Sequence, residues 1–321
     1  MEINPAIKLS FNQQLRKIRY IFGIVRKGLL LKYISCYKQS TKDRNISSSD
    51  FSVYLAVAAI VKNEVPYIAE WIEYHLIVGV QKFFIYDNES TDNLYEYLKP
   101  YINNGIVEYI FFPGKRQQVA VYNDALNRYK YSCYWLSFID IDEYLTLVSG
   151  ETLPEFLRDF EDVPGIEINQ VLYGSGGNKI KTEGLVIERF KDHSYYDYYA
   201  NKGVKSIINP RKIFYMQCAH TAKYFLGEYS VNSDKIKNIM PYSERSALHD
   251  KIRRNHYACK SYEEFISRID LGRATSPGKL SIDEFKNRDR NEIKNDPIMD
   301  KYIQKVKNNL DFRFNKKSNY G

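Results

Sequence analysis

The feature that most constrains the fold is a fourfold alternation of strand-like and helix-like patterns between residues 53 and 141. Residues 53–61 form an almost continuous apolar run, which is typical of a strand buried on both faces. Three further apolar runs follow at residues 82–86, 106–112 and 135–141, and segments with apolar residues at helical spacing separate the four runs. This alternation predicts a mostly parallel sheet with helices on both faces. We therefore expect an α/β fold.

The rest of the chain is less regular and suggests three parts. Residues 1–50 alternate bases with apolar residues, as in a basic helical extension, and end in a polar linker. Residues 51–275 hold the expected domain, and residues 276–321 form a charged tail with helical patterns. Within the domain we predict strands at residues 163–172, 184–190 and within 205–216, and a helix at residues 261–273.

The formal net charge of +8 suggests an anionic partner, such as nucleic acid, a membrane surface or a phosphorylated substrate. The basic N-terminal segment is consistent with a helix on an anionic membrane and equally with a helix packed on the main domain. No stretch approaches the ~20 apolar residues that span a bilayer, and no signal-peptide pattern is visible. We therefore expect a cytoplasmic protein, with peripheral contact to the inner face of the membrane left open.

Three polar segments follow directly after predicted strands, where ligands of open parallel sheets bind. These segments are Lys62-Asn63-Glu64, Asp87-Asn88-Glu89-Ser90-Thr91-Asp92 and Asp140-Ile141-Asp142-Glu143. Ser90 or Thr91 is also placed to cap the helix that follows. That all three segments follow strands is stronger evidence for a ligand site than any one segment alone.

The third segment has the chemistry of a metal site. Carboxylates at the end of a buried strand are costly unless a positive charge compensates them. Oxygen ligands of this kind suit Mg²⁺ or Mn²⁺. The pattern Asp140-x-Asp142 is a weak signal alone, because it occurs by chance, and gains weight from its place at a strand end. A solvated turn that caps a helix is the alternative.

Several segments of the chain resemble glycosyltransferase family 92. In the first half they are Ala59-Ile60-Val61-Lys62-Asn63-Glu64, Glu70-Trp71-Ile72-Glu73-Tyr74-His75, Phe84-Ile85-Tyr86-Asp87-Asn88 and Trp135-Leu136-Ser137-Phe138-Ile139-Asp140-Ile141-Asp142-Glu143-Tyr144. Later segments are Tyr173-Gly174-Ser175-Gly176-Gly177, Leu185-Val186-Ile187-Glu188-Arg189-Phe190 and Asn255-His256-Tyr257. Where the family usually ends its motif in Asp-Glu-Phe, this chain has Asp142-Glu143-Tyr144. The resemblance covers roughly residues 55–275.

The resemblance implies a GT-A fold, a nucleoside-diphosphate-sugar donor, Mn²⁺ or Mg²⁺ as cofactor, and inversion at the anomeric carbon. Residues 51–145 would then form the nucleotide-sugar half and residues 146–275 the acceptor half. The implied metal ligands are Asp140, Asp142 and His256, with His220 as second choice. The implied donor-binding residues are Lys62, Asn63, Glu64, Asp87, Asn88, Gln118, Asn123 and Asp140. Each histidine has a hydrogen-bonded core position as its alternative.

Direct displacement with inversion requires a general base that takes the proton of the acceptor hydroxyl. The sequence singles out no such base, and Glu188, Glu167 and Asp250 are only weak candidates. Arg189 beside Glu188 makes a structural ion pair equally plausible there.

These observations predict a hexosyltransferase that uses a UDP-sugar, with UDP-galactose favoured, and a glycan or lipid-linked acceptor. The expected setting is bacterial surface polysaccharide synthesis. One alternative is a nucleotidyltransferase, which normally has a glycine-rich loop after its first strand, whereas residues 62–66 contain no glycine. The other is a basic module that binds nucleic acid or a membrane surface, for which no known motif is present. We expect no nucleic-acid partner.

Overall fold

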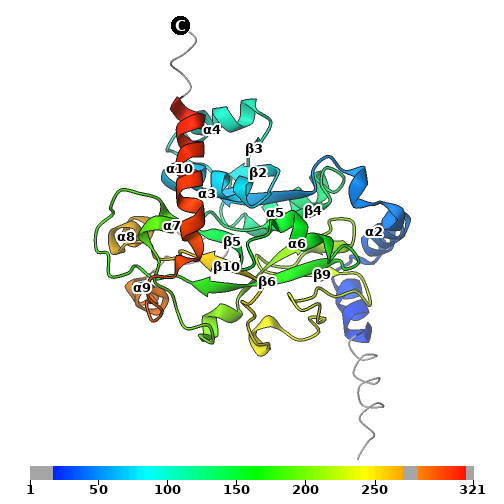
Figure 1. The fold of residues 1–321 in the computed structure, drawn as a ribbon. Helices are drawn as coiled ribbons and strands as arrows, with labels where there is room; N and C mark the ends of the chain where they lie inside the picture. The colour runs from blue at the N-terminus through cyan, green and yellow to red at the C-terminus, as the bar shows by residue number, and fades with distance from the viewer. Residues whose placement is uncertain (1–16, 270–280, 316–321) are drawn as a thin grey trace, which may run out of the picture.

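An eight-stranded sheet forms the centre of the molecule (Figure 1). The computed structural model describes residues 17–269 and 281–315. The strands are β1 (Leu55–Val61), β2 (Lys82–Asp87), β3 (Val107–Phe111), β4 (Trp135–Phe138), β5 (Glu143–Leu147), β6 (Gly165–Leu172), β7 (Val204–Ile208) and β10 (Ile252–His256). Their order is β3-β2-β1-β4-β7-β6-β10-β5. A separate two-stranded sheet consists of β8 (Ile213–Met216) and β9 (Ala222–Tyr224).

Strand direction gathers many strand ends at one edge of the large sheet. Strands β3, β2, β1 and β4 are parallel, and β7 runs antiparallel to both β4 and β6. Strand β10 is parallel to β6 and antiparallel to β5. The ends of β1, β2, β4, β6 and β10 therefore share an edge with the starts of β5 and β7. We call this the carboxyl edge. The α/β class and the mostly parallel sheet with helices on both faces, expected from the sequence, are confirmed.

Helices cover both faces of the sheet. The labelled helices of the described residues are α2 (Leu30–Lys42), α3 (Val65–Ile77), α4 (Leu94–Asn103), α5 (Gln118–Arg128), α6 (Leu153–Arg158), α7 (Val186–Arg189), α8 (Tyr262–Ile269), α9 (Ile282–Arg288) and α10 (Asp300–Asn315). Short 3-10 turns lie at Asp43–Asn45, Ser48–Asp50, Tyr199–Lys202, Tyr242–Glu244 and Pro297–Met299. Figure 1 shows α10 running alongside α3, and the two helices share a core with one face of the sheet. Helix α5 and the β8–β9 pair pack on the other face.

The alternation of side chains along β1 explains how one strand serves both layers. Leu55, Val57 and Ala59 point into the core under α3, whereas Ala56 and Ala58 point into the core under α5. Successive side chains of a strand face opposite sides, so an all-apolar strand is what a two-sided sheet requires.

Helix α3 is tied to β5 by buried polar groups. Trp71 Nε1 donates to the Glu143 carbonyl at 2.9 Å, and Tyr74 OH donates to the Leu145 carbonyl at 3.0 Å. His75 contacts the Trp71 carbonyl through Nδ1 at 2.8 Å and accepts from the Leu145 N–H through Nε2 at 3.3 Å. Burial lowers the pKa of His75 to about 3, so the ring is neutral and structural. These bonds fix the start of β5 at the carboxyl edge.

The strand predicted at residues 184–190 is wrong, because residues 186–189 form the short helix α7. The cause is a carboxylate from another part of the chain. Glu70 of α3 accepts the free first-turn N–H groups of Val186 and Ile187, at 2.8 and 3.0 Å. The predicted helix at 261–273 appears as α8 up to Ile269, and its remainder lies outside the described residues.

The basic N-terminal segment packs on the β8–β9 pair. Residues 17–26 are helical and lead into α2. Ile24 is buried with Phe214 and Phe225, and Tyr20 OH donates to the Tyr224 carbonyl at 2.6 Å. The predicted linker begins later than expected, because α2 continues to Lys42. Among the described residues, no helix has the length and apolar character needed to cross a membrane.

A buried ion pair anchors α8 to the domain. Glu264 of α8 receives two hydrogen bonds from Arg189, at 2.8 and 2.9 Å, and a third from Tyr67 OH at 2.9 Å. Burial alone would raise the pKa of the Glu264 carboxyl, but the Arg189 and Ser261 hydrogen bonds outweigh it and lower the pKa to about 2.

This pair predicts acid sensitivity. Since the folded-state pKa of Glu264 lies below its ordinary value, its contribution is present above about pH 4.5 and is lost as pH falls toward 2. The shift corresponds to a free energy on the order of 3 kcal/mol. In urea titrations between pH 7 and pH 3, Glu264→Gln should be less stable than wild type at pH 7 and approach it at low pH. Glu96→Gln, at an exposed pair with Lys99, serves as control. Parallel pH curves for wild type and Glu264→Gln would contradict the assignment.

Candidate functional site

The loops after β1 and β2 are joined by hydrogen bonds. The Asn63 N–H donates to Ser90 Oγ at 3.0 Å, and the Thr91 N–H donates to Asn63 Oδ1 at 2.7 Å. Asn63 has φ of 56°, in the left-handed region that asparagine tolerates. Neither Ser90 nor Thr91 caps α4, as the sequence had suggested, because Asn93 is the N-cap residue and no side chain caps that helix. Ser90 and Thr91 instead bond to Asn63 and so hold the two loops together.

Asp87 and Asn88 are fixed at the end of β2. Asp87 is 4% exposed, and its carboxylate accepts from the Ser90 N–H at 2.8 Å and from Tyr109 OH. Asn88 Nδ2 donates to the carbonyls of Phe112 and Gly114. A carboxylate has about four acceptor positions, so Asp87 retains capacity for a ligand.

Asp140, after β4, is held by a buried lysine. Lys205 of β7 is 1% exposed and donates to Asp140 Oδ2 at 2.9 Å. The other oxygen, Oδ1, accepts from Gln118 Nε2 at 2.7 Å and from Tyr122 OH at 3.1 Å. Burial would raise the pKa of Asp140, but the Lys205 ammonium outweighs it and the pKa is lowered. Both charges are therefore maintained inside the protein.

Glu143 completes the same charge network. Its carboxylate is paired with Arg254 of β10, lies 3.7 Å from Lys205 Nζ and accepts from the Asp140 N–H at 2.9 Å. Glu143 and Arg254 are each 1% exposed. Burial raises the pKa of Glu143 even though both cations oppose the shift. We call Asp140, Lys205, Glu143 and Arg254 the buried charge network.

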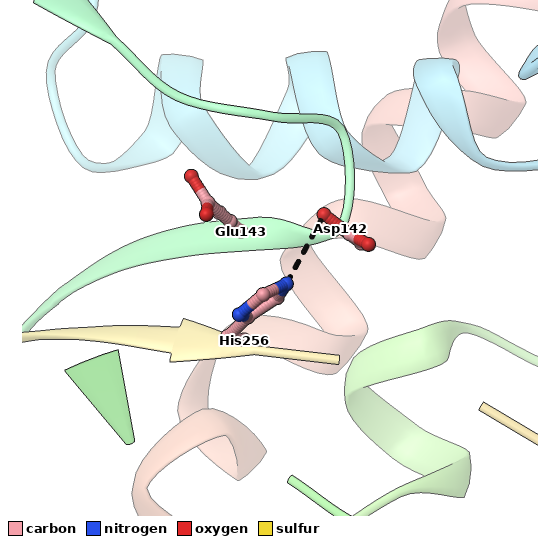
Figure 2. A group of neighbouring side chains, drawn as sticks. All are labelled: Asp142, Glu143 and His256. Carbon is pink, nitrogen blue, oxygen red and sulfur yellow. Dashed lines mark ion pairs between the residues drawn. The ribbon is translucent and has the colours of Figure 1, made fainter. Parts of the chain in front are cut away.

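Asp142 points away from this network toward His256. Figure 2 shows Asp142 and His256 facing one another across the start of β5 and the end of β10. Asp142 Oδ1 lies 3.6 Å from His256 Nε2, and Oδ2 accepts from Arg268 at 3.2 Å. Burial would raise the pKa of Asp142, but His256 in its protonated form and the Arg268 guanidinium hold it well below its usual range.

Potential metal-ligating atoms of Asp142, Glu143 and His256 lie within 4.8 Å of one another. The network already binds both Glu143 oxygens, which leaves Asp142 and His256 as the more available pair.

Gln170 determines which nitrogen of His256 is available. The Gln170 amide is oriented by two other contacts, since its Nε2 donates to the Ala200 carbonyl and its Oε1 accepts from Arg254. His256 Nδ1 lies 2.9 Å from that same Oε1 and must therefore be the N–H donor. In the neutral ring, Nε2 then presents a lone pair toward the Asp142 carboxylate. A proton on Nε2 compensates the two atoms at 3.6 Å in the charged ring, and in the neutral ring the same pair fits a divalent metal ion.

Other predicted site residues have different surroundings. His220 Nδ1 contacts the Val204 carbonyl at 3.0 Å, burial lowers the pKa of His220 to about 4, and His220 is outside the group around Asp142. Asn123 bonds to the backbone of Met216 through both its oxygen and its nitrogen, which ties α5 to β8. Lys62 is half-buried in the loop after β1, and Glu64 of that loop contacts Arg268 at 3.4 Å.

The structure places none of the three weak base candidates beside Asp142. Glu167 pairs with Arg245 at 2.6 Å, about 16 Å along β6 from the end of that strand. Asp250 precedes β10 at the end opposite His256. Glu188 of α7 binds Lys307 of α10 at 2.7 Å.

Sequence reasoning missed the cations that surround the acidic segment. They are Lys205, Arg254, Lys260 and Arg268. Two of them had a readable signal: a lysine inside the apolar strand Val204–Ile208 and an arginine inside Ile252–His256 each require a buried partner. Which acid each one meets depends on strand pairing, which the sequence does not show.

The sheet and the polar groups at its carboxyl edge define an α/β protein with a ligand site of the enzyme type. The chain belongs to glycosyltransferase family 92, whose family model matches residues 52–310. The match confirms the family resemblance and extends past residue 275 into α10.

Curated relatives from plants match parts of the chain. A glycosyltransferase family 92 protein of Oryza sativa subsp. japonica is 34% identical over 41% of this chain and 23% of its own length. A family 92 protein of Ricinus communis is 27% identical over 58% of this chain and 33% of its own. A galactan beta-1,4-galactosyltransferase of Arabidopsis thaliana is 30% identical over 32% of this chain and 22% of its own. The chain thus spans a third or less of these relatives.

Similarity to solved structures is low. The crystal structure of S. aureus TarS 1–349 aligns with 73% of this chain and 71% of its own, at 15% identity and a TM-score of 0.34. Glucosyl-3-phosphoglycerate synthase from Mycobacterium tuberculosis, in complex with Mn²⁺ and UDP, aligns with 50% of this chain and 58% of its own, at 15% identity and a TM-score of 0.28.

Lys205→Met should destabilise the protein by about 3–5 kcal/mol, because it leaves Asp140 without its buried cation. The change is measured by urea denaturation at pH 7. Lys251→Met removes a lysine from an exposed pair with Asp234 and should cost less than about 1 kcal/mol. Equal effects of the two substitutions would argue against a buried charge network that depends on Lys205.

Proposed function

We propose that this protein is a metal-dependent glycosyltransferase that transfers a sugar from a nucleoside-diphosphate sugar, with inversion at the anomeric carbon. The observation that carries the proposal is the Asp142–His256 pair, with Nε2 of the histidine directed at the carboxylate. Family membership supports the reaction class. The acceptor proposed from the sequence is a glycan or a lipid-linked saccharide.

Asp142 and His256 would hold Mn²⁺ or Mg²⁺, with Asp140 and Glu143 adjacent. Such an ion neutralises negative charge on a departing diphosphate. Gln170 fixes the tautomer of His256, and Lys205 fixes the carboxylate of Asp140. A site whose groups are already oriented loses no free energy to reorganisation when a ligand binds.

The nucleoside would bind over the joined loops after β1 and β2. Asp87 lies there with its carboxylate directed by Ser90 and Tyr109, and it is suited to accept hydrogen bonds from ribose hydroxyls or a base N–H. The hydrogen bond from the Asn63 N–H to Ser90 Oγ holds the two loops together. The proposal assigns no general base.

UDP-galactose is the donor we favour, because three plant relatives are named galactan beta-1,4-galactosyltransferases. Synthesis of a bacterial surface polysaccharide stays a prediction, since the relatives named above come from plants. The family match weighs against a nucleotidyltransferase and against a simple binding module.

A donor screen tests the proposal directly. Purified protein is incubated with UDP- and GDP-sugars, with and without Mn²⁺ or Mg²⁺, and release of nucleoside diphosphate is measured. We expect metal-dependent release, its loss in Asp142→Asn, and a reduction of about 10- to 100-fold in Gln170→Leu, which frees the histidine tautomer. Asp234→Asn, at an exposed ion pair, is the control and should retain activity. Normal turnover by Asp142→Asn would refute the metal site.

The N-terminal helices present an apolar and basic outer face. The exposed large apolar side chains are Ile18, Ile21, Phe22, Val25, Leu30, Leu31, Ile34 and Tyr37. The exposed bases are Lys17, Arg19, Arg26, Lys27, Lys32, Lys38 and Lys42. This combination is complementary to an anionic bilayer surface, and we propose that the protein docks there from the cytoplasm through this face. Packing of the inner face on β8–β9 would fix the enzyme relative to the membrane.

Vesicle sedimentation tests the membrane proposal. The protein should sediment with vesicles that contain anionic phosphatidylserine or phosphatidylglycerol and much less with neutral vesicles. A Phe22→Ser/Leu31→Ser double variant should lose binding, since each removes a side chain that is more than half exposed. Dimerisation of the wild type in the absence of vesicles, abolished by the same substitutions, would assign the face to a second copy instead.

A further inference from the structure

Lys260 is a buried cation without a hydrogen-bonding partner. It is 2% exposed, and in the described part of the chain its Nζ meets no acceptor. The ammonium lies 4.3 Å from the centre of the Tyr67 ring, which compensates the charge only in part. Buried polar groups normally have hydrogen-bonding partners, so an ammonium of this kind indicates a binding site for an anionic ligand.

Arg268 of α8 is a second cation near Lys260, and it contacts two carboxylates. Its guanidinium donates to Asp142 Oδ2 at 3.2 Å and lies 3.4 Å from Glu64 Oε1. Three carboxylates lie near Lys260: Glu64 and Asp142 share Arg268, and Glu264 pairs with Arg189. None of the three accepts a hydrogen bond from Lys260, so the N–H donors of its ammonium stay unused until another anion enters. An arginine has five N–H donors, so Arg268 can also bind such an anion.

The contacts of Arg268 indicate what this anion would be. Asp87 follows β2, which lies beside β1, and Arg268 connects Glu64 after β1 to Asp142 at the start of β5. A ligand that connects a nucleoside at Asp87 with a metal ion at Asp142 must cross the end of β1. Glu64 lies at that end, in contact with Arg268. In a nucleoside-diphosphate sugar, the part between nucleoside and metal is the diphosphate.

The position of Lys260 is fixed by the start of α8, which follows it directly and is held by the Arg189–Glu264 ion pair. Ser261 and Glu264 cap the start of α8 reciprocally, with N–H to side-chain distances of 3.0 and 3.2 Å. Glu264 in turn is held by Arg189 and Tyr67. Hydrogen bonds made by the residues after Lys260 thus fix its position, and within the described residues the Lys260 ammonium makes none.

We propose that Lys260 and Arg268 form a cationic clamp that binds the diphosphate of the donor. The clamp rests on the proposed function for the identity of its ligand. The two cations have complementary roles: Arg268 connects the loop after β1 to the metal carboxylate, and Lys260 supplies an ammonium whose N–H donors are unused. The clamp thereby selects nucleoside diphosphates over nucleosides.

Calorimetric binding of UDP, GDP, uridine and inorganic pyrophosphate, in the presence of Mn²⁺, tests the clamp. Lys260→Met and Arg268→Gln should each weaken UDP binding about tenfold or more, which is the loss of one charge-assisted contact, and leave uridine binding unchanged. Lys181→Met is the matched control. Lys181 lies near the same Tyr67 ring, at 5.3 Å, but is exposed.

A stability measurement separates this role from a structural one. Lys260→Met removes a buried ammonium that is desolvated and makes no hydrogen bond within the described residues, and the variant should have a Tm equal to or above that of wild type. A lower Tm, or failure to fold, would show that the ammonium supports the fold and would overturn the clamp. Unchanged UDP affinity in a folded Lys260→Met protein would overturn it as well.

The outcomes also separate the clamp from the proposed function. If wild type binds neither UDP nor GDP but binds pyrophosphate in a Lys260-dependent manner, the anion site stands and the nucleotide donor is wrong. If wild type binds UDP and Lys260→Met binds it equally, the donor stands and the clamp is wrong. If wild type binds none of these ligands, both are wrong.

Discussion

The buried charge network is the interaction on which the rest of the site depends. Two carboxylates, Asp140 and Glu143, lie at the end of a buried strand, where an uncompensated charge is expensive. Their cations come from β7 and β10, in the second half of the chain. The first half of the sheet therefore has no stable carboxyl edge until the second half packs beside it. A buried ion pair of this kind specifies an arrangement more than it adds stability.

The network also divides the tasks of neighbouring acids. Asp140 and Glu143 are turned toward Lys205 and Arg254, whereas Asp142 between them faces His256. One short turn thus has two acids that hold the architecture and one that remains available to a ligand. The motif Asp140-x-Asp142 suggests two equivalent ligands, but the two residues have different partners.

The sequence predicted the first half of the fold well, because strand and helix periodicities there are local. The apolar composition of residues 53–61 and 135–141 indicates that these strands are buried, as the structure shows for β1 and β4. The second half was harder. Residues 186–189, predicted as part of a strand, form a helix because Glu70, far away in the chain, caps it. The positions of Asp87 and Asp142 at one edge followed from the ends of the predicted strands, and His256 followed from the family resemblance. The partners of Lys205 and Arg254 follow only from strand register.

The insertion of β10 between β6 and β5 has a consequence for how the protein is made. Arg254 and Glu143 are 111 residues apart in the chain, and Arg268 and Asp142 are 126 apart. Contacts of such long sequence separation form slowly and late in folding. On the ribosome, the acidic turn would emerge long before the strand that completes it. A chain released early would have the nucleotide-side loops but neither the imidazole nor the cations that give the site its charge balance. Competence of the site is thereby coupled to synthesis of the chain past Arg268.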